Sequence, residues 1–119
     1  MVIGHHGHTL QEVEKYRGKW ILYGIGNFMF NSPGRYKRYP DILPFGGGVE
    51  LSFKDAVRQP VVRLYPIYSD NVASNYLPRF ANAKEVELIR NALVSRRSDG
   101  RLPPIVIERN EMGDHLRLK

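Results

Sequence analysis

Three of the four histidines of this chain lie within five residues, in the sequence Gly4-His5-His6-Gly7-His8. Imidazole is a common ligand for zinc and similar metals, and it also titrates near neutral pH. In an extended segment His6 and His8 project to the same side, since strand side chains alternate, and His5 faces the other way. The spacing therefore predicts that His6 and His8 together face one divalent metal or one phosphate-like anion. An affinity-tag remnant or a frayed polar terminus is the competing interpretation.

Asn27 is a second candidate position, because it follows Gly24-Ile25-Gly26 at the end of an apolar run. Two glycines within three residues indicate close backbone approach or positive φ. The third glycine of a dinucleotide-binding loop is absent, and the next residues do not open a helix, which argues against that kind of site. Two interpretations of Asn27 stay open: a residue that lines a site, and a turn residue that tolerates left-handed geometry.

The stretch from residue 31 to residue 48 is rich in proline and glycine, and it mixes tyrosines with the basic residues Arg35, Lys37 and Arg38. Loops of this length are usually either functional lids or disordered segments. The sequence leaves both open. The aromatic and basic side chains favour a lid that faces an anionic polymer or substrate.

The 119 residues, of which 42% are hydrophobic, are typical of one small globular domain. A net charge of +6 suits a polyanionic partner, but the basic residues are scattered, so we predict no nucleic-acid partner. Without cysteine, a metal site must use His, Asp, Glu or Asn. No apolar run approaches the roughly 20 residues of a transmembrane helix, and no secretory signal pattern is present. The compartment is unknown.

The first elements must position the histidines. Met1 to Ile3 is typical of the end of a strand whose beginning is missing. Thr9 and Glu12 fit a capping box, which predicts a short helix over residues 10–17 that ends at Gly18. The apolar run 20–23 predicts a buried central strand.

The middle of the chain predicts a β-hairpin. Residues 49–53 alternate apolar and polar side chains, and residues 61–65 supply the second arm after a turn at 54–56. Pro66 is expected to close this strand, because proline cannot donate to a ladder.

The last third predicts one helix and one strand. A cap-like start at residues 82–85 and apolar residues at helical spacing predict a helix that ends near Val94. Residues 105–107 predict a final short strand. Residues 108–119 are expected to be a charged tail in which His115 is solvated.

Several of these segments stand in the same order as in a known family. Residues 2–11 with His-x-His, then residues 16–19, then residues 21–30 with Gly-Asn-Phe, resemble the C-terminal part of bacterial CapA-type capsule and poly-γ-glutamate synthesis proteins. That family has a fold similar to the calcineurin-like metallophosphatases. The resemblance covers about the first third of the chain. It departs from the family at Gly7, where proline is more frequent, and at Gly24, where serine is usual.

The resemblance implies a site. His6 and His8 match a His-x-His pair that contributes ligands to a two-metal centre, with Mn or Zn as the expected cofactor, and His5 and Asn27 would line that site. The remaining metal ligands of such a centre have no counterpart in this sequence. Two imidazoles alone leave a divalent metal short of protein ligands. Two-metal phosphoesterase chemistry therefore cannot be assembled from these residues alone.

The resemblance also implies a fold and partners. We expect an α/β (α+β) chain, residues 1–119, that forms the C-terminal segment of a larger metallophosphatase-like αββα sandwich, with a mixed β-sheet and two short helices, and that is inactive alone. Its expected partner is the missing N-terminal half of its own domain. The alternative is a non-catalytic module that binds an anionic polymer or a partner domain through the basic and aromatic loop. Self-association through an exposed sheet edge is a third possibility.

Overall fold

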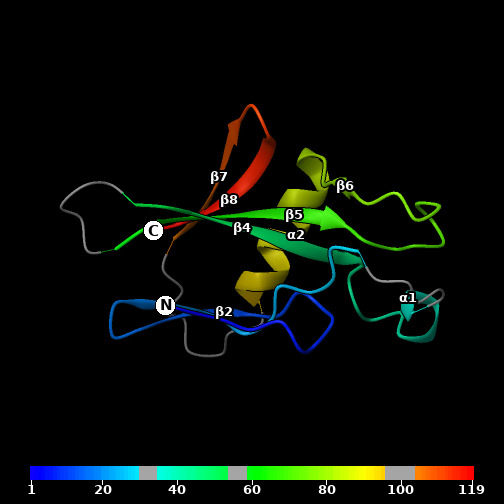
Figure 1. Cartoon of the computed structure of the whole chain (residues 1–119), viewed down its shortest axis with the longest axis horizontal. Helices are drawn as coiled ribbons and strands as arrows, with labels where there is room; N and C mark the ends of the chain where they lie inside the picture. The colour runs from blue at the N-terminus through cyan, green and yellow to red at the C-terminus, as the bar shows by residue number, and fades with distance from the viewer. Residues whose placement is uncertain (30–34, 54–58, 96–103) are drawn as a thin grey trace.

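The computed structural model describes residues 1–29, 35–53, 59–95 and 104–119, and its strands form two sheets around a shared core (Figure 1). The small sheet has the strand order β1-β3-β2, and the large sheet has the order β4-β5-β8-β7 with β6 paired to β5. The small sheet is mixed and the large sheet is antiparallel. The fold class is therefore mixed α and β, as predicted. The elements are β1 (Val2–Ile3), β2 (Val13–Tyr16), β3 (Lys19–Leu22), α1 (Arg35–Arg38), β4 (Phe45–Ser52), β5 (Val61–Tyr68), β6 (Arg79–Phe80), α2 (Ala83–Ser95), β7 (Ile105–Asn110) and β8 (Gly113–Leu118).

The predicted helix over residues 10–17 is wrong, because the chain forms strand β2 there. Thr9 does not cap a helix; its hydroxyl donates to the Gly7 carbonyl at 3.4 Å. The backbone of Gln11 and Glu12 is already bonded to the segment after β3, through Gln11 N to Gly24 O at 2.8 Å and Tyr23 N to Glu12 O at 3.2 Å. The groups that a helix would pair internally are thus used in a sheet.

Gly18 therefore ends a strand instead of a helix. Arg17 has φ 46° and Gly18 has φ 73°, and these two residues join β2 to β3. Positive φ at both central residues is the signature of the tight two-residue turn that suits the twist of a hairpin.

Two strand predictions in the small sheet are confirmed. Residues 2–3 form β1, which pairs in parallel with β3, and β3 is the central strand. The expectation that residues 20–23 are buried on both faces is wrong in part: Trp20 and Leu22 are buried, whereas Tyr23 is exposed. Alternating burial follows from the small size of the sheet, which has only one face on the core.

The hairpin of β4 and β5 is confirmed, with Val49 opposite Leu64, but it is longer than predicted at both ends. β4 begins at Phe45, inside the stretch predicted as a loop, and the predicted turn at 54–56 lies outside the described residues. Pro66 does not close β5. Gly47 stands opposite Pro66 in the ladder, but these two residues are not bonded to each other. The amide of Gly47 donates to the Ile25 carbonyl, and the Pro66 carbonyl accepts from the Ala81 amide at 2.9 Å. The missing proline amide therefore costs no bond to β4.

The predicted charged tail is wrong as well, since residues 105–118 form the hairpin β7–β8. Gly113, with φ 116°, stands at its turn. β8 also pairs with β5, so it is an inner strand of the large sheet. His115 is 1% exposed, packs with its ring 4.8 Å from that of Tyr65, and lies 3.9 Å from Glu108. The expectation of a solvated His115 is overturned.

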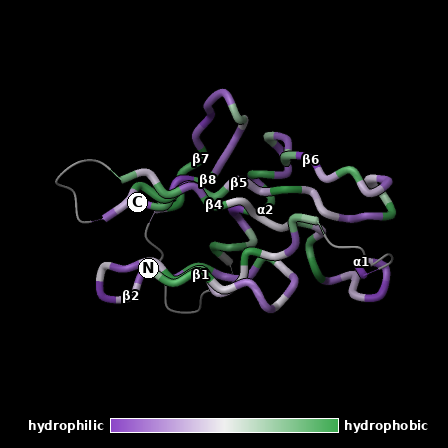
Figure 2. Tube along the Cα trace, in the orientation of Figure 1, coloured by the Kyte–Doolittle hydropathy of each residue, from purple (hydrophilic) through white to green (hydrophobic). Residues whose placement is uncertain are grey.

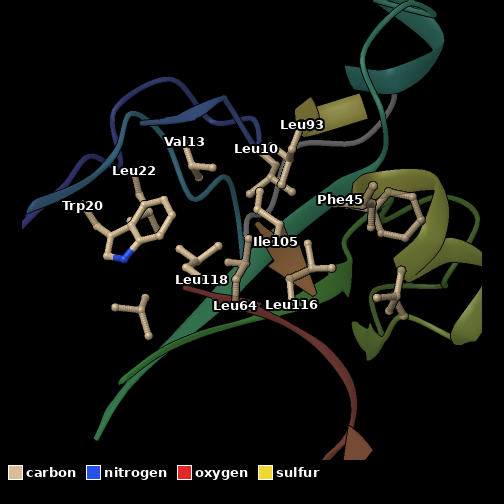
Figure 3. Packing of buried hydrophobic residues seen from close by; sticks show 14 residues of the cluster. Leu10, Val13, Trp20, Leu22, Phe45, Leu64, Leu93, Ile105, Leu116 and Leu118 are labelled. Atoms are coloured by element: carbon tan, nitrogen blue, oxygen red, sulfur yellow. The ribbon is translucent and has the colours of Figure 1, made fainter. Parts of the chain in front are cut away.

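The structure confirms the prediction of helix α2, both its N-terminal cap and its buried apolar stripe. The side chain of Asn82 accepts from the amide of Glu85 at 3.1 Å, and the carboxylate of Glu85 accepts from the amide of Asn82 at 2.8 Å, which is a complete capping box. Its apolar stripe of Val86, Ile89 and Leu93 is at most 1% exposed. Figure 3 shows Leu93 among core residues that come from both parts of the fold. The other labelled residues of this cluster are Leu10, Val13, Trp20, Leu22, Phe45, Leu64, Ile105, Leu116 and Leu118.

Candidate functional site

The histidine loop, residues 4–9, leaves β1 and is fixed at its base by the small sheet. Gly4 donates to Leu22 O at 2.7 Å, and its own carbonyl accepts from Ile25 at 3.0 Å. A Cβ on Gly4 would collide with the Tyr23 carbonyl, so the close approach requires glycine. The loop is thereby held beside the segment that follows β3, in which Asn27 lies.

The two candidate ligands are close together, but not for the predicted reason. Residues 6–9 form a turn with φ 56° at His8, so the loop is not an extended strand. The ring centroids of His6 and His8 nevertheless lie 6.5 Å apart. His6 is exposed and His8 is half-buried, while His5 is exposed on the same loop. The turn, and not strand alternation, brings the pair together.

His8 is oriented by Asn27. Its Nδ1 lies 2.8 Å from Oδ1 of Asn27, whose side chain is buried at 6% exposure. A carbonyl oxygen can only accept, so this contact requires the proton on Nδ1. In the neutral ring Nε2 then carries the lone pair that could bind a metal, which is how a neighbouring acceptor commonly orients a metal-binding histidine.

Two glycines place Asn27 against the large sheet. Gly26 has φ 70°, and a Cβ on it would lie 2.9 Å from the Cα of Gly46 in β4. A Cβ on Gly46 would in turn collide with the backbone of Asn27. Gly47 also donates to Ile25 O at 2.6 Å. Close backbone contact, as the glycine pattern predicted, thus joins the two sheets directly beside the site.

Among the three predicted basic residues, Arg35 reaches the histidine loop. Its Nη2 donates to the Gly7 carbonyl at 3.4 Å, whereas Lys37 and Arg38 are exposed on α1. The segment is anchored by Tyr36, whose hydroxyl lies 3.0 Å from Oγ of Ser69. Sequence reasoning missed both Tyr36–Ser69 and Arg35–Gly7, since no local pattern marks a contact across 28 or 33 positions.

A complete metal centre is not present in the part of the chain that the structure describes, where no group of three His, Asp or Glu side chains could hold a metal ion. Two imidazoles supply half of the usual four ligands of zinc. The described residues also contain no helix that is long and apolar enough to cross a bilayer.

Comparison with known proteins bears on this same segment. Residues 1–32 match the family model of the bacterial capsule synthesis protein PGA_cap. This N-terminal segment is therefore similar to the CapA-type capsule synthesis family. A relative, the PGA biosynthesis protein CapA of Bacillus subtilis (strain 168), is 45% identical over 31 residues. The alignment covers 26% of this chain and 8% of that protein, so the chain spans far less than two thirds of its relative. The CapA-type match contains β1 to β3, the histidine loop and Asn27, and it ends before α1.

Proposed function

We propose that this chain forms part of a CapA-type protein of capsule or poly-γ-glutamate synthesis, in which His6 and His8 contribute ligands to a composite divalent-metal site. The observation that carries this proposal is the contact of His8 Nδ1 with Asn27 Oδ1 at 2.8 Å, beside the ring of His6. It directs Nε2 of a half-buried imidazole away from its anchor. Mn or Zn fits imidazole ligands.

The metal site needs at least one further ligand, from a segment or chain outside the described residues. We infer that it belongs to a metallophosphatase-like sandwich, to which this chain contributes its two sheets. The packing of Leu10, Val13 and Leu22 against Leu64 of the large sheet supports a layered arrangement (Figure 3). Without the further ligands, the chain alone should show negligible phosphoesterase activity.

The test is a metal titration of the chain with Zn²⁺ and Mn²⁺ in competition with a chromophoric chelator. Weak binding that is lost in His6→Ala and in His8→Ala, and kept in the control His5→Ala, supports the proposal. Phosphoesterase turnover that survives the double substitution His6→Ala and His8→Ala would contradict the assignment of these ligands.

A second candidate function is a non-catalytic module that binds an anionic polymer or a partner domain. The observation that favours it is the exposed cationic surface of α1, which Figure 2 draws as hydrophilic at the edge of the molecule. Calorimetry with a polyanion distinguishes the two functions. Salt-sensitive binding that depends on Lys37 and Arg38 but ignores His6 and His8 favours the module.

A further inference from the structure

We propose that Arg35, together with His6, binds one oxyanion, a carboxylate or a phosphate group, at the histidine loop. This inference deepens the proposed function, on which it rests for the role of the histidines, by naming the chemical class of the substrate group. It joins two stretches that the sequence keeps apart, the histidine loop and the basic segment α1.

The Arg35 guanidinium is incompletely hydrogen-bonded. It is half-buried, and the hydrogen bond that holds it at the loop is the long one of 3.4 Å from Nη2 to the Gly7 carbonyl. Within the described part of the chain its buried Nε has no hydrogen-bond partner, and no carboxylate there forms an ion pair with it. A guanidinium has five N–H donors, and leaving a buried donor unpaired is costly. Arg35 therefore has donors to spare for an acceptor that is not part of the described chain.

That guanidinium lies at the turn of the histidine loop. Gly7 lies between His6 and His8, so the contact from Nη2 to Gly7 O places a permanent positive charge at the turn that carries both imidazoles. The turn is reached from outside, because the His6 side chain is exposed. The exposed His6 ring can offer an N–H at the same loop. The planar guanidinium matches the two oxygens of a carboxylate or phosphate.

The positive charge of Arg35 favours an anion over a cation as its partner. A guanidinium beside two imidazoles works against binding of a bare metal ion, since like charges repel. It stabilises an anion at the same place, including one that is held by a metal. The described residues supply no cluster of acidic and imidazole ligands that would reverse this balance. Arg35 thus has the chemistry of a substrate-binding residue and not of a metal-supporting one.

The ring of Tyr39 explains why the guanidinium stays near the loop. The Cζ atom of Arg35 lies 5.9 Å from the centre of this ring, and the neighbouring Tyr36 is tied to Ser69. Cation–π contact and the tyrosine anchor restrict the orientation of α1. The Arg35 donors are therefore partly preorganised for binding.

The experiment is a titration of the metal-free chain with inorganic phosphate and with a hexaglutamate peptide, followed by isothermal calorimetry and by the amide NMR signal of Gly7. We expect Arg35→Ala to weaken binding about tenfold, the weight of one charge-assisted hydrogen bond. Arg35→Lys should restore part of the affinity. The control Lys84→Ala, an exposed cation on α2, should change the affinity less than twofold. Circular dichroism checks that each variant is folded.

The outcomes separate this inference from the proposed function. Tighter binding of phosphate assigns a phosphoryl group, and tighter binding of the peptide assigns a carboxylate; either upholds the inference if it depends on Arg35. Equal affinity of Arg35→Ala and the unsubstituted chain, or an equal loss of affinity in Lys84→Ala, overturns it. Zinc affinity, measured separately, should not fall in Arg35→Ala. Loss of zinc binding with retained Arg35-dependent anion binding would refute only the metal site.

Discussion

Nδ1 of His8 lies 2.8 Å from Oδ1 of Asn27, across 19 positions of the chain. This bond links the histidine loop to the segment that follows β3, and it fixes both the tautomer and the direction of one imidazole. We expect this bond to contribute to metal binding.

Asn27→Ala should lower zinc affinity about tenfold, because the His8 ring loses the acceptor that orients Nε2. Asn27→Asp retains an acceptor oxygen and should retain most of the affinity. Competition with a chromophoric chelator measures both. Equal zinc affinities for Asn27→Ala and the unsubstituted chain would show that the contact does not orient a ligand.

Gly46→Ala should destabilise the fold by about 1–3 kcal/mol, since its Cβ would collide with the Asn27 backbone. Gly48 is a matched control in the same strand, because a Cβ there would meet Cδ1 of Ile67 at an ordinary 3.7 Å. Gly48→Ala should change the free energy of unfolding by less than about 0.5 kcal/mol. Urea denaturation compares the two, and similar losses for both would refute the close contact between the sheets.

Glu85 should make the stability depend on pH. Arg79, which donates to both carboxylate oxygens at 2.7 Å, is the main cause that holds the pKa of Glu85 below its usual 4.5, and the Asn82 amide adds to it. Because the folded-state pKa is lowered, the stabilisation is present above pH 4.5 and is lost as the pH falls through the folded-state pKa. Glu85→Gln should therefore cost about 1 kcal/mol at neutral pH, and its difference from the unsubstituted chain should vanish in acid.

Urea midpoints at neutral pH and in acid measure this difference. Glu87, exposed on the same helix, provides the control, and Glu87→Gln should leave the midpoint unchanged at both pH values. A constant deficit of Glu85→Gln at every pH would mean that the carboxylate charge does not contribute.

Chemical labelling of histidines should separate the buried residue from the loop. Diethyl pyrocarbonate should modify the exposed His5 and His6 in the native protein, and His115, at 1% exposure, only after denaturation. Peptide mass spectrometry reads the sites. Labelling of native His115 as fast as that of His5 would contradict the β7–β8 hairpin as described.

A local sequence pattern predicts the structure correctly when no tertiary hydrogen bonding competes with it. The capping box of Asn82 and Glu85 is followed by Val86, Ile89 and Leu93 at helical spacing, so cap and periodicity agree and α2 is predicted correctly. Thr9 and Glu12 show the same cap pattern, and Leu10, Val13 and Tyr16 stand at helical spacing beside it. There β3 offers the backbone an alternative set of hydrogen bonds, and tertiary pairing overrides the local signal.

Burial of a polar residue is harder to predict, because it depends on what covers it. The sequence around His115 predicts a charged tail, yet the ring of Tyr65 packs against His115 in the large sheet. The site shows the same division. The motif makes His6, His8 and Asn27 candidates, whereas the approach of Arg35 to Gly7 depends on the path of the chain between the two sheets.

The bond from Gly47 to Ile25 has a consequence for the order in which the protein is made. The segment beside the histidine loop is bonded to β4, β4 pairs with β5, and β5 also pairs with β8, which follows it in the sequence by more than 40 residues. During synthesis the N-terminal part leaves the ribosome first. The histidine loop therefore emerges before β8, but its supporting framework is complete only after β8 has been released.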